Sequence, residues 1–179
     1  TPLTIVLSFI VFVVLLITLN SSFYKVDEGS RGVVLRSGQI YGIATPGLGV
    51  KLPLFDKVVQ VDTRTQKITA KTVGQSRDNQ IVNMVIVVNY HYDSNRLGTI
   101  YSRYGFDLGD KVITPRVEEI AKAVIAEFSA STMISKRNDV KDMVDTALRK
   151  ELSKYDIVVE SVMITSFAFN DSYQEAIEA

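Results

Sequence analysis

The sequence predicts an α+β protein whose chain begins with a membrane-spanning helix. Three observations support this fold class: an uncharged apolar start, strand-like alternation from about residue 26, and helical periodicity from residue 95. A further strand and the start of another helix follow. We therefore expect four regions: an anchor at 1–25, a strand-rich subdomain at 26–94, a helix-strand subdomain at 95–169 packed against it, and a helix start at 170–179.

Composition excludes several classes of site and partner. Hydrophobic residues make up 46% and charged residues 22% of the 179 residues, which is typical of a globular protein. The 20 basic and 20 acidic side chains cancel, so the overall charge favours no nucleic-acid partner. The absence of cysteine excludes disulfides and thiolate metal sites. With His91 as the single histidine, neither a histidine metal cluster nor a Ser/His/Asp triad is expected.

The apolar start has the length of a membrane span. Thr1–Tyr24 contains no charged residue, and Leu3–Leu19 is apolar except for Thr4, Ser8 and Thr18. At about 1.5 Å per residue, roughly 20 residues of helix cross a hydrocarbon core about 30 Å thick. Ser and Thr hydroxyls can bond to carbonyls of their own helix, so they are tolerated in such a segment.

The residues after the apolar run favour a span over two alternatives. Phe23, Tyr24 and Lys25 suit the headgroup level of a bilayer. A cleaved signal peptide fits less well, because the run is long and residues 20–23 make a poor cleavage site. A buried core helix would need a larger protein around it. The chain lacks an initiator Met, so we expect its start to be trimmed, and the side of the membrane that holds the body stays open.

Alternating residues predict the strands of the first subdomain. Residues 32–36 form a short apolar strand, and the alternation at 57–65 predicts another, on which Asp62 and Arg64 project to the same side. One alternative for these two side chains is pairing, with each other or with a neighbouring strand; the other, which is favoured, is a solvated face. The strongest strand is 81–92, and one of its faces is wholly apolar: Val82, Met84, Ile86, Val88, Tyr90 and Tyr92.

Helical spacing predicts three helices in the second subdomain. The first is a short amphipathic helix near residues 97–104, and the second runs from about 112 to 128 with Pro115 near its start. A third helix, capped by Ser135, carries an apolar stripe. The stripe consists of Val140, Met143, Val144, Ala147, Leu148 and Leu152.

The end of the chain predicts a strand and then a new helix. Residues 157–167 form the strand, and Asn170 or Asp171 can cap a helix beginning at Ser172. A helix this short is marginal in water by itself, so we expect it to continue beyond Ala179 and to support assembly.

Candidate catalytic residues are few. His91 lies between two tyrosines on the half-polar face of a strand, where a structural or surface role is favoured over metal binding. The best case for a hydrolase is Ser129 or Ser131 with Lys136, but serines before a helix are more often caps. The sequence has no nucleophile elbow, phosphate loop or His-x-x-x-His motif. We therefore predict no catalytic, cofactor-binding or metal-binding residues and no enzyme activity.

A set of short motifs runs along the chain in a fixed order. They are Glu28–Val34, Pro46–Leu48, Pro53, Val61–Arg64, Asp78–Gln80, Tyr104–Gly105, Ile113–Pro115, Ala123–Ala130, Lys136–Arg137, Phe167–Phe169 and Glu175–Ala179. None is diagnostic alone. The ordered set, which covers essentially the whole chain, resembles the SPFH (band 7) family and its prohibitin-like members most closely.

The resemblance implies a function that composition and periodicity do not. Members anchor in or on a membrane, pair two SPFH subdomains, continue into a long coiled-coil helix, and assemble into rings or cages around a membrane patch. The implied partners are copies of the chain or a paralogue, membrane lipids, and a membrane-bound AAA protease. The implied location is the bacterial cytoplasmic or mitochondrial inner membrane. This chain ends where the coiled coil would start.

Two other functions remain open beside the scaffold. The first is a stomatin-like membrane-anchored module that binds lipid through apolar segments of the first subdomain or regulates a channel. The second, the less favoured, is the membrane-tethered hydrolase described above.

Overall fold

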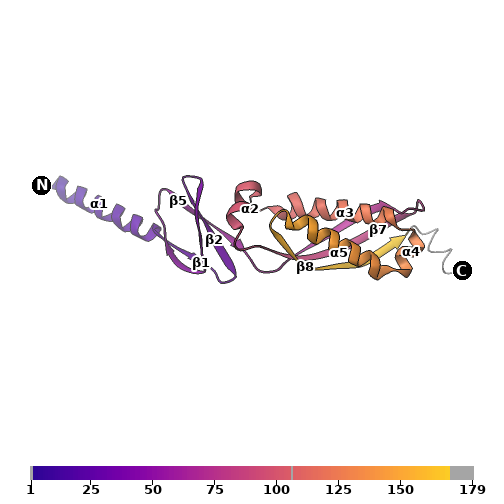
Figure 1. The fold of residues 1–179 in the computed structure, drawn as a ribbon. Helices are drawn as coiled ribbons and strands as arrows, with labels where there is room; N and C mark the ends of the chain where they lie inside the picture. Colours follow the sequence, from indigo (N-terminus) through magenta and orange to yellow (C-terminus); the bar gives the residue numbers. More distant parts are fainter. Residues whose placement is uncertain (1, 106, 170–179) are drawn as a thin grey trace. The chain divides into compact units, whose positions relative to one another are not determined.

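A computed structural model describes residues 2–105 and 107–169 of the chain (Figure 1). Contacts between residues divide the chain into two units. Unit 1 comprises the residues up to Arg64 together with Leu97–Ser102, and unit 2 comprises Thr65–Arg96 and the residues from Arg103 onward. The expected coiled-coil start at 170–179, with its cap at Asn170 or Asp171, lies outside the described residues.

The N-terminal apolar segment forms one long helix, α1 (Pro2–Ser21), in unit 1. The helix is shorter than the expected anchor at 1–25, because Phe23–Val26 form strand β1. This strand pairs antiparallel with β4 (Gly47–Val50), and its first pair is Phe23 with Val50. Residues 23–25 therefore belong to a small sheet.

A second sheet completes unit 1. Its strand order is β3-β2-β5, with β2 (Ser30–Arg36), β3 (Gln39–Ala44) and β5 (Asp56–Asp62). The turn between β2 and β3 is made by Ser37 and Gly38, whose φ angles of 49° and 86° suit a two-residue hairpin turn. The strand expected at 57–65 ends earlier, at Asp62. Strands β1, β3 and β4 were not expected from the sequence.

Unit 2 is a three-stranded antiparallel sheet with helices on one face (Figure 1). The sheet order is β6-β7-β8, with β6 (Gln66–Gln75), β7 (Ile81–Tyr92) and β8 (Ile157–Phe169). The helical elements are α2 (Leu97–Tyr104), which begins in unit 1, η1 (Gly109–Ile113), α3 (Thr114–Glu127), α4 (Ala130–Ser135) and α5 (Arg137–Ser153). Helix α3 packs on β6 and on α5, and α5 packs on β8.

The apolar face expected for strand 81–92 is confirmed. All six of its residues, from Val82 to Tyr92, are buried. The helices meet this face with Val117, Ala121, Val124 and Ile125 of α3 and with Val140, Val144, Leu148 and Leu152 of α5. The alternation of β7 therefore places one side of the sheet in the core of unit 2 and leaves the other side open.

The division between the units differs from the expected boundary after residue 94. Strand β6, which the sequence analysis missed, pairs with β7 from Gln66↔Tyr90 to Gln75↔Ile81. Strand β8 pairs with the other edge of β7. The β6–β7 hairpin therefore joins the sheet of β8, because β7 needs both neighbours to satisfy its backbone groups.

The start of α3 is as expected from the sequence, and the start of α5 is not. Pro115 lies in the first turn of α3, as predicted. Ser135 does not cap α5, which has Lys136 at its N-cap position. The Ser135 hydroxyl instead donates to the carbonyls of Ser131 and Thr132 in the preceding helix. Ser135 is the last residue of α4, so its hydroxyl bonds to carbonyls of its own helix and not to the start of α5.

Candidate functional site

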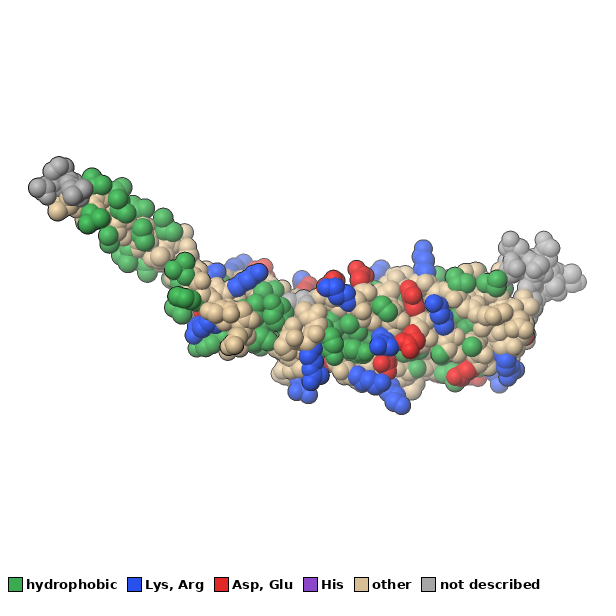
Figure 2. Space-filling view, turned by 90° about the horizontal axis from the view of Figure 1, so that it is seen from above, with side chains coloured by type: hydrophobic (Ala, Val, Ile, Leu, Met, Phe, Trp, Pro, Cys, Tyr) green, Lys and Arg blue, Asp and Glu red, His purple; other side chains and the backbone are tan. Residues whose placement is uncertain are grey.

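The surface of α1 is apolar along its whole length. The window Thr4–Ser21 has a mean hydropathy of 2.5, and none of it is buried against the rest of the protein. Figure 2 shows no basic or acidic side chain along α1. The Thr18 hydroxyl donates to the carbonyls of Val14 and Leu15, 3.0 Å and 2.9 Å away, and that of Ser22 donates to Thr18. By length and composition, α1 is a candidate membrane span.

The serines proposed for a hydrolase have structural roles. Ser129 is the N-cap of α4, and its hydroxyl oxygen accepts from the backbone N–H of Thr132. The same hydroxyl lies 2.7 Å from that of Thr132 and 3.2 Å from that of Ser131. Among the interactions of the described residues, none joins the side chain of Lys136 to either serine. The arrangement is a helix cap, and it offers Ser129 no general base.

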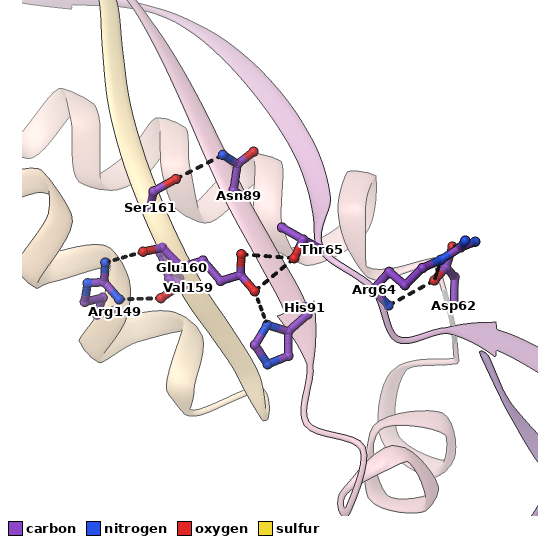
Figure 3. A network of polar contacts seen from close by, with 9 residues as sticks. All are labelled: Asp62, Arg64, Thr65, Asn89, His91, Arg149, Val159, Glu160 and Ser161. Atoms are coloured by element: carbon purple, nitrogen blue, oxygen red, sulfur yellow. Dashed lines mark hydrogen bonds and ion pairs between the residues drawn. The ribbon is translucent and has the colours of Figure 1, made fainter. Parts of the chain in front are cut away.

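His91 belongs to a polar network on the open face of the sheet (Figure 3). Its Nδ1 atom lies 2.9 Å from Oε1 of Glu160. Thr65 donates its hydroxyl hydrogen to the same carboxylate, with oxygen distances of 2.9 Å and 3.0 Å. Beside this group, Asn89 donates to Ser161 over 3.0 Å. The Thr65 hydroxyl donates to the Glu160 carboxylate and not to the His91 imidazole, so His91 is not placed to activate Thr65 as a nucleophile.

Two arginines of α5 reach the backbone of β8. Arg149 is held by Asp145 and donates to the carbonyls of Val159 and Glu160 (Figure 3). Arg137 donates to the carbonyl of Ile164 over 3.0 Å. The strand thus has carbonyl groups that bond to α5 and are not available to an added strand. Such covering is one way in which proteins protect a sheet edge from pairing with another chain.

The Arg–Asp pair drawn in Figure 3 lies in unit 1. Asp62 accepts hydrogen bonds from the backbone N–H and the guanidinium of Arg64, at distances from 2.8 Å to 3.0 Å. Of the two alternatives for these residues, the structure therefore shows pairing. Both side chains remain exposed, so the pair adds little stability.

The open face of the unit 2 sheet carries both polar and apolar side chains. Lys67 and Lys71 of β6 are exposed on it. Val73, Ile81 and Met163 are also exposed, to 58%, 51% and 44%. No group of three or more His, Asp or Glu side chains suited to a metal ion occurs among residues 2–105 and 107–169. This face therefore combines exposed cationic and exposed apolar side chains.

Several contacts that shape these features were not predicted from the sequence. Glu160 was not singled out, and the contacts of Arg137 and Arg149 with β8 were not predicted, because the partners lie on strands and helices whose pairing the sequence does not reveal. Figure 3 shows Glu160 and Arg149 with their partners, which come together because β8 pairs with β7 and packs against α5. The i,i+4 spacing of Asp145 and Arg149 in the sequence fits the ion pair that they form, but it carries no information about the contact of Arg149 with β8.

Comparison with known proteins shows the family of the chain. The sequence profile described as "SPFH domain / Band 7 family" matches residues 24–179. The chain belongs to the SPFH family. This confirms the resemblance inferred from the ordered motifs. The match begins immediately after α1, so the SPFH domain comprises the sheets and helices that follow the apolar helix.

Among the curated SPFH relatives, those with significant similarity include prohibitins. Prohibitin-2 of Saccharomyces cerevisiae is 30% identical over 165 residues, or 90% of this chain and 53% of the relative. Mitochondrial prohibitin complex protein 1 of Caenorhabditis elegans is 29% identical, covering 89% and 58% of the two chains. Prohibitin-7, mitochondrial, of Arabidopsis thaliana is 30% identical, covering 89% and 58%. The chain thus spans a little over half the length of these relatives.

Proposed function

We propose that this SPFH chain is part of an oligomeric membrane scaffold that forms a ring or cage around a patch of membrane. The observation that carries the proposal is an SPFH domain joined directly to a long, uncharged helix. Such a scaffold regulates the membrane proteins that it encloses or binds. It acts through assembly and has no catalytic residues of its own.

The anchor in this proposal is α1. The helix exposes its apolar side chains on every side, which suits a lipid environment and is costly in water. The curated relatives include prohibitins whose names place them in mitochondria. The membranes that we propose are the mitochondrial inner membrane or, in a bacterium, the cytoplasmic membrane. The side of the membrane that holds the SPFH domain is left open.

The partners in this proposal are other SPFH chains and membrane lipids. The name of the Caenorhabditis elegans relative describes a component of a prohibitin complex, which supports assembly with copies of the chain or a paralogue. The open face of the unit 2 sheet, with Val73, Ile81 and Met163 exposed, offers a contact surface for a neighbour. A contact between two different surfaces of neighbouring copies closes into a ring when the rotation permits. A membrane-bound AAA protease is the proposed client.

A second candidate function is a stomatin-like module that binds lipid or regulates a channel without forming a cage. The observation that favours it is the group of exposed apolar side chains in unit 1, near the end of α1. The two functions differ in the number of copies that act together.

The size of the natural full-length protein in mild detergent tests both candidates. We expect a particle of many copies by light scattering and a ring or dome in negative-stain images. A monodisperse monomer would contradict the scaffold. A monomer that co-purifies with one lipid species, identified by mass spectrometry, would instead support the lipid-binding module.

A further inference from the structure

The connection between β4 and β5 in unit 1 presents apolar side chains to its surroundings. Leu54 is 86% exposed, Phe55 61% and Leu52 49%. Val50, the last residue of β4, and its partner Phe23 on β1 extend the same group and are also exposed. Soluble proteins rarely collect large apolar side chains on one exposed turn without a partner.

The strand register places this turn beside the end of α1. Strand β1 follows α1 directly and runs away from it, and β4 is antiparallel to β1. The chain in β4 therefore runs back toward the helix. The backbone N–H of Lys51 donates to the carbonyl of Ser22 over 2.7 Å, immediately after α1 ends. Residues 52–55 thus lie beyond the last strand pair, on the side of the helix terminus.

An ion pair with a buried carboxylate and a partly exposed arginine supports the turn. The Asp56 side chain is 2% exposed and accepts hydrogen bonds from Nε and Nη2 of Arg36, at 2.8 Å and 3.0 Å. The same carboxylate accepts from the backbone N–H of Leu52 over 3.0 Å. These hydrogen bonds of Asp56 fix the backbone at both ends of the turn. The backbone that carries the apolar side chains therefore does not have to be ordered when the turn meets a partner.

The backbone of the turn is largely paired within the protein. The N–H groups of Phe55 and Asp56 donate to the carbonyl of Leu52, and the carbonyl of Phe55 accepts from Ser37. Pro53 has no N–H to satisfy. Internal pairing of this kind is what a segment needs in order to leave water, because unpaired backbone groups are costly in an apolar medium.

Two lysines lie near the turn and the end of α1. Lys51 directly precedes the turn, and Lys25 follows the end of α1 on β1. Lysines at this level reach headgroup phosphates while their stems stay among apolar groups. An apolar tip bordered by cations, next to the end of an apolar helix, fits the interface of a bilayer better than it fits a protein surface.

We propose that residues 52–55 insert into the interfacial layer of the bilayer beside the end of α1, as a second membrane contact. The inference rests on α1 being the membrane anchor of the proposed function. Leu54 and Phe55 enter to about 5–10 Å, the depth typical of interfacial segments. Unit 1 is then docked on the membrane at two points and not tethered by α1 alone.

The chain lacks tryptophan, so a single introduced tryptophan reports its own surroundings. The experiment places the full chain in vesicles of phosphatidylcholine and phosphatidylglycerol whose acyl chains are brominated at chosen depths. In the Leu54→Trp variant we expect blue-shifted emission that shallow bromines quench by about half. The matched control is Ile134→Trp, an apolar position 48% exposed on α4, which should not be quenched.

A third variant separates failure of this inference from failure of the anchor. Phe12→Trp lies in the middle of α1 and should be quenched most by bromines deep in the bilayer. Quenching of Phe12→Trp without quenching of Leu54→Trp would overturn the inference and leave the anchor standing. Blue-shifted but unquenched emission from Leu54→Trp would also overturn it, because a protein would then cover the turn. Loss of quenching in both variants would refute the membrane anchor itself.

Discussion

The guanidinium of Arg36 and the carboxylate of Asp56 form a two-point ion pair between neighbouring strands, with distances of 2.8 Å and 3.0 Å. The two residues face each other in the register of β2 and β5. The ring of Tyr41 lies 3.7 Å from the guanidinium carbon of Arg36 and covers its other side. This cluster joins all three strands of the unit 1 sheet and supports the turn at residues 52–55.

Substitution of Asp56 should therefore lower the thermal stability of unit 1. The hydrogen bonds from Arg36, and then that from the backbone of Leu52, lower the pKa of Asp56 from 3.8 to about 2. A lowered pKa means that the carboxylate stabilises the fold fully above pH 3.8 and progressively loses this effect as the pH falls through 2. Asp56→Asn should unfold at a lower temperature than the wild type at pH 7, and the difference should shrink below pH 4.

Circular dichroism melting of both proteins in detergent, from pH 2 to pH 7, measures this difference. The matched control is Asp62→Asn, which breaks the pair with Arg64, a contact that is much more exposed. We expect its melting temperature to change less. Equal melting of Asp56→Asn and the wild type at neutral pH would contradict the stabilising role of the cluster.

Removal of Arg149 should destabilise unit 2 through the backbone of β8. Arg149→Met leaves the carbonyls of Val159 and Glu160 without this charged donor. A hydrogen bond to a charged group contributes roughly 1.5–3 kcal/mol. The Arg149 side chain is 45% exposed, so solvent weakens both bonds, and we expect a total loss of about 1–3 kcal/mol in the free energy of unfolding. Urea titration of both proteins measures this difference in the free energy of unfolding.

Arg116→Met is the control for Arg149→Met. Arg116 also pairs with an acidic residue on its own helix, Glu119, and that pair is solvent-exposed. An exposed pair of this kind contributes about 0–1 kcal/mol. Equal effects of the two substitutions would show that the contact of Arg149 with β8 adds no stability.

Thr72 should tolerate loss of its hydroxyl. Its Oγ1 atom is buried on β6 and has no hydrogen-bond partner among the described residues. A buried polar atom without a partner costs about 1–3 kcal/mol, so Thr72→Val should be neutral or raise the free energy of unfolding. Thr63→Val, which removes a hydroxyl bonded to the carbonyl of Gly29, should instead lower it by about 1 kcal/mol. A clear loss of stability in Thr72→Val would refute the prediction.

A charge on the open sheet face should disrupt assembly if this face contacts a neighbour. Ile81→Asp introduces a carboxylate where an apolar side chain is 51% exposed, so the fold should survive. We expect the mass of the detergent-solubilised particle to fall, because burying an unpaired charge at an interface is costly. The control, Ile134→Asp, makes the same change at a similarly exposed position on α4. An unchanged particle mass for Ile81→Asp would exclude this face from the contact.

Local patterns in the sequence identify the helices and strands that present a continuous apolar face. Helix α1 is apolar on all sides, and β7 has one wholly apolar face, so its expected range, 81–92, matches the structure. Strand β6 was missed because its outward residues include Lys67 and Lys71 and its inward ones include Thr72 and Gly74, which give no apolar alternation. The burial of β6 depends on α3, which packs on this strand and whose Ile125 lies against Gly74.

Which elements pair with one another was decided only in the tertiary structure. The expected boundary after residue 94 grouped β7 with the strands of the first subdomain, whereas the structure places the β6–β7 hairpin in unit 2. The sequence does not reveal that β8, more than 60 residues later, pairs with β7. The pairs Arg36–Asp56 and His91–Glu160 likewise join residues far apart in the chain. Backbone periodicity depends on neighbours three or four positions away, and so a sequence reveals it directly. Strand register depends on which distant segments bury their apolar faces together, and that is a property of the whole folded chain.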